Sequence, residues 1–228
     1  MFHAYSPSHL VVLAVFGAGT VVLLTWGRRL RGTRWEHPVA VAFAVANLVF
    51  GVVSMVLGMV PFHVESSLPL QICGFVWIVV AWALISRRPT PTALTYYWGL
   101  TLTLQAILQP TLEQPFPEPR FFVFWLKHLA IFWGAVYLTL TLRNGPDWRG
   151  YRRTVGWTFV WLFAVLGLNV VLGSNYGYVN RKPSSGTVLD VLGPWPGYLA
   201  AEVAIVLVGW ALITLPWTGL PGRRRAPG

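Results

Sequence analysis

Charged residues are scarce in this chain, and cysteine is almost absent. Of its 228 residues, 11% are charged and 55% are hydrophobic, whereas a soluble domain carries about 25% charged residues. The composition therefore excludes an ordinary soluble protein. Cys73 is the only cysteine, so an intramolecular disulfide is excluded as well.

Motifs for binding metals and cofactors are also lacking. The sequence has no zinc-type spacing of Cys and His, no glycine-rich phosphate loop and no helix motif with paired histidines. We therefore expect neither a metal nor a cofactor. Internal repeats and low-complexity segments are missing too, and we predict a single domain over residues 1–228.

Long apolar runs dominate what is present. A bilayer is crossed by about 20 apolar residues in a helix, and prolines mark the ends of most of the runs. The first run has no basic residues before it and no small-residue cleavage site after it, unlike a signal peptide. We predict an all-α polytopic membrane protein with seven transmembrane helices, at 8–26, 39–60, 69–86, 92–109, 121–142, 155–173 and 198–216.

The basic residues fix an orientation for these helices. Thirteen of the seventeen Lys and Arg fall in loops 26–38, 86–92 and 143–154 and in the tail, which carries Arg223, Arg224 and Arg225. Cytoplasmic loops are rich in Lys and Arg, so we predict the N-terminus outside and the C-terminus in the cytoplasm. Because topology accounts for the net charge of +10, we expect no nucleic-acid partner. Many Arg, Ala, Val and Trp residues indicate a GC-rich bacterial genome, and hence the cell membrane.

Polar side chains within the spans gather near the predicted outer surface. Buried ionisable groups in a membrane normally face the bundle interior or a wet cavity. We therefore predict one pocket, open to the outer leaflet, that is lined by Cys73, Gln105, Gln109, His128, Asn169 and Glu202.

Each of these side chains also has a structural interpretation. A lone Cys often serves as a small buried hydrophobe, and Gln and Asn form hydrogen bonds between membrane helices. Lys127 can extend to the surface, and Glu202 can pair with Lys127 or His128. A catalytic interpretation rests on Cys73 and His128, because a Cys–His pair performs nucleophilic acyl chemistry. Amides of Gln105, Gln109 or Asn175 could then stabilise an oxyanion.

Several segments together resemble a known family. They are 68–73 (LPLQIC), 97–112 with Gln105 and Pro110, 121–128, Asn175-Tyr176, and 192–198 (LGPWPGY). In combination they resemble the YwaF-type integral membrane family, which is similar to the eukaryotic transmembrane protein 164 family. The chain departs from the pattern at Gln71, where many bacterial relatives have His, and at Gly74.

The resemblance implies a seven-helix fold and a lipid acyltransferase that remodels phospholipids through Cys73 and His128. The supporting or substrate-binding residues are then Gln71, Gln105, Gln109, Asn169, Asn175 and Glu202. We therefore expect a phospholipid acyltransferase or lipid acyl hydrolase, whose partners are membrane phospholipids. The alternative is a non-catalytic transporter or a lipid- or ligand-binding membrane subunit. An odd number of spans argues against a simple inverted repeat of the transporter type.

Overall fold

The computed structural model describes residues 2–182 and 188–218, and the regular secondary structure within those ranges is helical. The tail arginines 223–225 lie outside the described residues. Helices long and apolar enough to cross a membrane run over Pro7–Leu30, Glu36–Gly58, Pro119–Thr141, Trp148–Leu172 and Gly197–Thr218. The protein is thus an all-α, multi-pass membrane protein, and these helices match five of the predicted spans.

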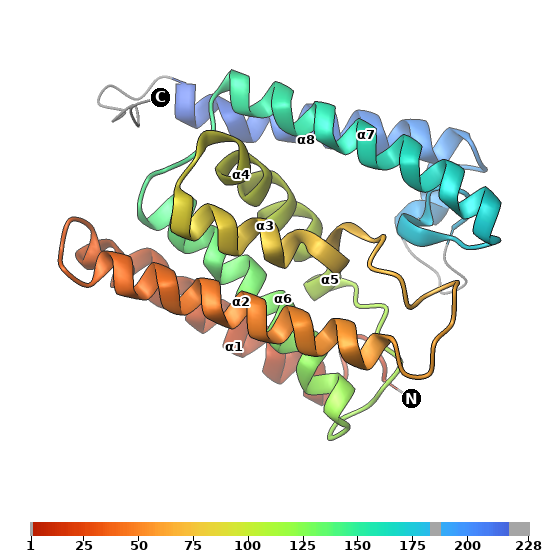
Figure 1. Ribbon diagram of the computed structural model, residues 1–228, viewed down its shortest axis with the longest axis horizontal. Coiled ribbons are helices and arrows are strands. Elements are labelled where there is room, and N and C mark those ends of the chain that lie inside the picture. Colours follow the sequence, from red (N-terminus) through yellow and green to blue (C-terminus); the bar gives the residue numbers. More distant parts are fainter. Residues whose placement is uncertain (1, 183–187, 219–228) are drawn as a thin grey trace.

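Figure 1 labels the helices along the chain. The long ones are α1 (Pro7–Thr25), α2 (Glu36–Gly58), α6 (Pro119–Ala135), α7 (Trp148–Leu172) and α8 (Gly197–Thr218). A 3-10 turn, η1 (Gly27–Leu30), follows α1, and a π-helical segment, η3 (Val136–Thr141), follows α6. Short 3-10 turns η4 (Tyr176–Tyr178) and η5 (Val188–Leu192) precede α8.

Two further helical segments occupy the third and fourth predicted spans. The first is α3 (Ile72–Ser86), and the second runs unbroken through α4 (Pro89–Leu94), the π-helical η2 (Thr95–Leu102) and α5 (Thr103–Leu108). The 15 residues of α3 rise about 22 Å at roughly 1.5 Å per residue, against a hydrocarbon core of about 30 Å. The count of seven transmembrane helices therefore stays a prediction.

The start of α3 corrects the sequence prediction. We expected that helix to open at Pro69, but it begins at Ile72. The backbone ahead of it is bound elsewhere, because the Leu68 N–H donates to the Tyr176 hydroxyl at 2.9 Å and the Leu70 carbonyl accepts from Trp161 Nε1 at 2.8 Å. These contacts hold the segment in a non-helical path.

Helices α3 to α6 lie in the middle of the helical bundle. Helix α2 packs on α3 and α6, α4 packs on α7, and α7 packs on α8. Figure 1 shows α7 and α8 together along one edge and α1 and α2 along the opposite one. Small residues permit close helix contacts: a Cβ added at Gly134 of α6 would lie 2.9 Å from Val80 Cγ1 of α3, and one at Gly51 of α2 would overlap Trp77.

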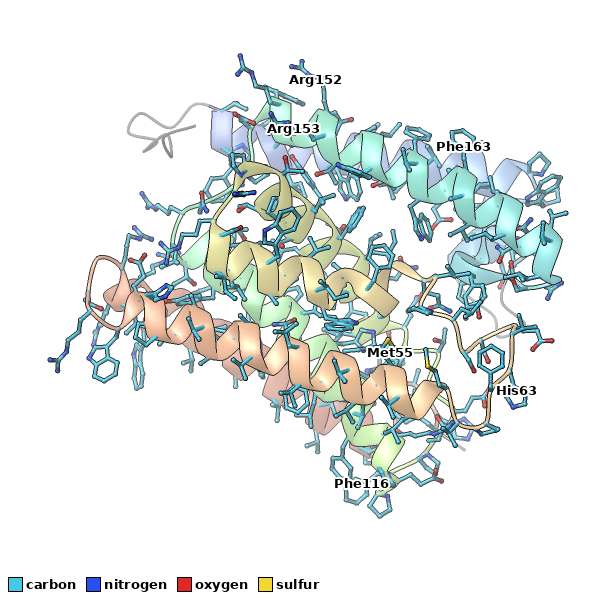
Figure 2. The ribbon with its side chains drawn as sticks, viewed as in Figure 1. Met55, His63, Phe116, Arg152, Arg153 and Phe163 are labelled. Atoms are coloured by element: carbon cyan, nitrogen blue, oxygen red, sulfur yellow. The ribbon has the colours of Figure 1, made fainter. Side chains whose placement is uncertain are left out.

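The loops gather at two ends of the molecule. At what we call the arginine end, Arg87 pairs with Glu36 at 2.5 Å, and Arg153 donates to Thr90 Oγ1 at 3.3 Å. The opposite end, which we call the loop end, contains residues 59–71, 109–118 and 173–182. Figure 2 shows Arg152 and Arg153 at the first of these ends and His63 at the other, with Phe163 of α7 projecting away from the bundle.

Helix α8 is fastened near both of its termini. Toward the arginine end, Trp210 Nε1 donates to Thr101 Oγ1 at 3.0 Å, and the hydroxyls of Tyr97 and Thr214 are 2.6 Å apart. Toward the loop end, the Tyr198 hydroxyl donates to the Tyr178 carbonyl at 2.5 Å. Between these attachments the first half of α8 stands away from α3 and α5, and the space left between them is the cavity described next.

Candidate functional site

A cavity of about 240 Å³ lies among the start of α3, α5, α7, η4 and the first half of α8. Much of its wall is apolar, with Leu162 and Val206 among the contributors. Ligand pockets are typically concave, mostly apolar and equipped with a few placed polar groups. This cavity has that character, so it is the candidate site.

Five of the predicted site residues lie on its wall. They are Gln71, Cys73, Gln105, Gln109 and Glu202. Gln105 lies in α5 and Gln109 is the residue just after it, and the Gln109 N–H donates to the Gln105 carbonyl at 2.7 Å, so the two residues lie one above the other. Helices α3, α5 and α8 therefore bring a thiol, a carboxyl group and primary amides to one apolar space.

Cys73 is the second residue of α3 and is partly buried. The first N–H groups of a helix have no partner within it, and the N-terminal end of a helix attracts negative charge. Gln71 precedes the helix as N-cap without capping it through its side chain. Thr103 of α5 and Lys127 of α6 lie near the thiol, and the Thr103 hydroxyl donates to the Trp98 carbonyl at 3.4 Å.

His128 does not lie on the cavity wall. It is 3% exposed, and its Nδ1 donates to the Phe124 carbonyl at 2.7 Å. A carbonyl can only accept, so Nδ1 carries a hydrogen. Among the residues described, no hydrogen bond joins His128 to Cys73.

The placement of His128 follows from the faces of α6. Ala135 and Ile131 of that helix contact Gly99 of η2, where an added Cβ would lie 2.9 Å from Ala135 Cβ. His128 is two turns before Ala135 and one before Ile131, so it shares their face. It thus points toward the η2–α5 segment, whereas its neighbour Lys127 lies about 100° around the helix, since a turn has 3.6 residues.

Glu202 faces the cavity without a cationic partner. Over residues 2–182 and 188–218 the ion pairs are Arg87–Glu36 and Lys182–Asp190. The pairing of Glu202 with His128 or Lys127 that we considered is therefore not formed. The reason is geometric, because α6 contributes no residue to the cavity wall.

Asn169 has all of its hydrogen-bonding groups occupied away from the cavity. Its Oδ1 accepts from Tyr176 N and Ser174 Oγ, both at 2.8 Å, and its Nδ2 donates to the Tyr176 carbonyl at 3.0 Å and to Asn180 Oδ1 at 2.7 Å. The residue is 2% exposed. It therefore shapes the turn after α7 and does not line the predicted pocket.

Asn175 is occupied in the same turn. Its Nδ2 donates to the Arg181 carbonyl at 2.8 Å, and its Oδ1 accepts from Arg181 N at 3.1 Å. This amide is held by the backbone, so it is not available to stabilise an oxyanion, and it lies off the cavity wall. Asn169 and Asn175 thus order the loop that follows α7.

Three residues near the site were not singled out as candidates from the sequence. Trp161 holds the segment before α3, and Thr103 lies near Cys73. His9 of α1 is fully buried, accepts from Tyr5 N at 2.8 Å and bonds the Ile107 carbonyl at 2.9 Å, which ties α1 to the helix of Gln105. Tryptophans and hydroxyls are common in apolar helices, so no sequence signal marked the first two.

The described part of the chain contains no cluster of metal-binding side chains. There, no three His, Cys, Asp or Glu side chains gather closely enough to hold an ion. The site instead offers a thiol, a carboxyl group, amides and hydroxyls. This set suits covalent acyl chemistry or the binding of a polar, acyl-bearing ligand.

Comparison with known proteins gives one match. The sequence model of the TMEM164 family matches residues 4–214, which include every helix of the fold apart from the last turn of α8. Neither the curated proteins nor the solved structures include a match.

Proposed function

This chain belongs to the TMEM164 family, and from that premise we propose that it is a phospholipid acyltransferase, or a lipid acyl hydrolase, that uses Cys73 as its nucleophile. The observation that supports this most is the position of Cys73. The only thiol of the chain lies at the N-terminal end of α3, on the wall of a largely apolar cavity that also presents three glutamine amides. A fatty acyl ester suits such a space, with its chain against the apolar wall and its carbonyl beside the amides.

The reaction would proceed in two steps. The Cys73 thiolate attacks the ester carbonyl carbon, a C–S bond forms, and the C–O bond to the lipid breaks, which leaves an acyl thioester. Gln105, Gln109 and the first N–H groups of α3 would stabilise the oxyanion. Water or the hydroxyl of a second lipid then attacks the thioester, with His128 Nε2 as the general base, and the thiolate is released.

The remaining polar groups would hold the lipid in place. Glu202 is the carboxylate of the wall, and an unpaired carboxylate accepts hydrogen bonds from a donor in the ligand. Gln71 adjoins Cys73 at the start of α3. We assign both to substrate binding, and Asn169 and Asn175 to support of the loop beside the cavity.

The topology forms part of the same proposal. Seven transmembrane helices, including α3 and the α4–η2–α5 segment, would cross the cell membrane with the N-terminus outside and the C-terminus in the cytoplasm. The arginine end then faces the cytoplasm, in keeping with the excess of Lys and Arg in cytoplasmic loops. Because Gln71 and Gln109 adjoin the loop end, the cavity would open to the outer leaflet and its phospholipids.

A second candidate is a non-catalytic lipid-binding protein. The observation in its favour is the separation of Cys73 from His128, which share no hydrogen bond among the described residues. A cavity of the same shape would then retain a lipid without breaking it.

The deciding experiment measures lipid turnover by the purified protein. The wild-type protein is incubated with vesicles of mixed phospholipids, and mass spectrometry follows free fatty acid and newly acylated lipid. We expect turnover in the wild type and none in Cys73→Ala. The control is Thr25→Ala, an exposed position on α1 away from the cavity, which should match the wild type. Equal turnover in the wild type and Cys73→Ala would refute the catalytic thiol.

A further inference from the structure

The contact between α3 and α6 relates the positions of Lys127 and Cys73, which share no hydrogen bond among the described residues. Both helices run from the loop end toward the arginine end (Figure 1). They meet closely where Gly134 of α6 lies against Val80 of α3. Seven residues make about two helical turns and return to the same face. Seven residues before Val80 is Cys73, and seven before Gly134 is Lys127, so these two side chains occupy matching positions on the facing stripes.

The environment of Lys127 agrees with this geometry. Its amine interacts electrostatically with Cys73. Within the described ranges it takes no part in an ion pair, since those pairs use Arg87 and Lys182. A cation inside a membrane protein is costly and normally pairs with an anion or a polar group. The thiol is the acidic group that α3 presents to it.

We propose that Lys127 is the electrostatic partner of the Cys73 thiolate and a positioning residue for its chemistry. The thiol proton passes to Lys127 Nζ: the S–H bond breaks, an N–H bond forms, and the products are a thiolate and an ammonium group whose charges cancel. Thr103 of α5 lies near the same sulfur. An adjacent lysine is among the groups that convert a protein thiol into a reactive thiolate.

The other ionisable groups near this pair have separate places. His128 follows Lys127 on α6 but lies on the face toward α5, and Glu202 lies on α8 across the cavity. Helix α5 presents Thr103 and Gln105, which carry no charge. His128 is then left to accept the proton of the attacking water or hydroxyl, and Lys127 to accept the proton of the thiol. That division rests on the proposed function, whereas the thiolate pair does not.

Alkylation of the thiol tests the pair directly. Cys73 is the only cysteine, so iodoacetamide uptake by the purified protein reports on that sulfur alone. The rate is measured from pH 6 to pH 10 for the wild type, Lys127→Met, Lys127→Gln and Lys127→Arg. We expect both neutral variants to react about tenfold more slowly at pH 7, since a tenfold change corresponds to one pKa unit, and to approach the wild-type rate at high pH. Lys127→Arg should retain the fast reaction.

A matched control removes a different cation from the same helix. Arg120→Met at the start of α6 deletes an exposed charge that binds the Leu57 carbonyl, and its alkylation profile should equal that of the wild type. A thermal unfolding curve shows which variants are folded. Two neutral Lys127 variants are used so that the test still works if one of them fails to fold. An unchanged profile in a folded Lys127→Met or Lys127→Gln protein would overturn the proposal.

Lipid turnover separates this inference from the proposed function. If the wild-type protein turns over no lipid but Lys127→Met loses the fast alkylation, the thiolate pair is supported and the acyl chemistry is rejected. If lipid turnover depends on Cys73 but the Lys127 substitutions leave the alkylation profile unchanged, the acyl chemistry is supported and the pair is rejected.

Discussion

Trp161 donates its indole N–H to the carbonyl of Leu70 at 2.8 Å, which ties the middle of α7 to the residue just ahead of the helix that carries Cys73. The turn after α7 reinforces this tie. Gly177 of that turn has a positive φ of 68°, and an added Cβ would lie 2.7 Å from Trp161 Cη2. The position of the thiol is therefore set by a tryptophan and a loop that lie about 90 and 100 residues further along the chain.

The Tyr176 hydroxyl forms hydrogen bonds with the same segment ahead of α3, and its removal should destabilise the protein. The hydroxyl donates to the Val64 carbonyl at 2.7 Å and accepts from Leu68 N at 2.9 Å. Because Tyr176→Phe leaves both backbone groups without this partner, we expect a loss of about 1–3 kcal/mol in the free energy of unfolding. Thermal unfolding in detergent measures it, and Tyr5→Phe, at a tyrosine that is 58% exposed, is the control. Equal midpoints for the two variants would contradict this role.

Asn169 and Asn175 offer a matched pair for the loop after α7. Asn169 is buried and makes four hydrogen bonds, whereas the two bonds of Asn175 are exposed to solvent. Leaving a buried polar group unpaired costs about 1–3 kcal/mol, and exposed groups can turn to water. Asn169→Ala should therefore lower the unfolding midpoint much more than Asn175→Ala. A larger effect at Asn175 would mean that its amide has a role beyond the turn.

The limits of the sequence can be seen at particular residues. Apolar runs predicted most of the long helices to within a few residues, because the hydrocarbon core sets their length. The exception is α7, which begins at Trp148, whereas its predicted start was 155. The start of α3 could not be predicted, since Trp161 and Tyr176 of a distant segment hold residues 68–70. Likewise, the direction in which the His128 side chain points could not be predicted, because it depends on which helices pack against α6.

The same reasoning explains the amides. Gln105 and Gln109 were expected on one face, and both lie on the cavity wall, because a spacing of four residues fixes a shared face whatever the neighbours are. Asn169 has the same chemistry and a similar depth. Its role is different because the turn at 174–180 folds back onto it, and no local pattern predicts such a contact.

Glu202 should affect function more than stability. It forms no ion pair in the described part of the chain, so Glu202→Gln removes a charge without leaving a buried partner unpaired. We expect the free energy of unfolding to change by no more than about 0.5 kcal/mol, as for a substitution outside any network, while lipid turnover falls. A large loss of stability in Glu202→Gln would point instead to a hidden structural partner.

The orientation of the chain can be tested with reporter fusions. If the arginine end faces the cytoplasm, reporters that are active only in the cytoplasm should be silent when fused at Glu65 or Arg181 and active when fused after Arg143. The same result is expected after residue 225. The reverse pattern would place the cavity on the cytoplasmic side and would exclude the outer leaflet as its source of lipid.

The thioester intermediate gives the sharpest prediction about Cys73. If this thiol takes an acyl group from a phospholipid, intact-mass measurement after brief incubation with lipid should show a population heavier by one fatty acyl group. Neutral hydroxylamine should remove that mass, because it cleaves thioesters, and Cys73→Ala should never acquire it.

Variants of the neighbouring basic residues then resolve the order of steps. His128→Gln should retain the acyl adduct and lengthen its lifetime, since His128 is assigned to the attack on the thioester. Lys127→Met should slow the appearance of the adduct, since fewer thiolates are available to form it. An adduct that persists in Cys73→Ala would move the acyl group to another residue, and a shorter lifetime in His128→Gln would remove that histidine from the second step.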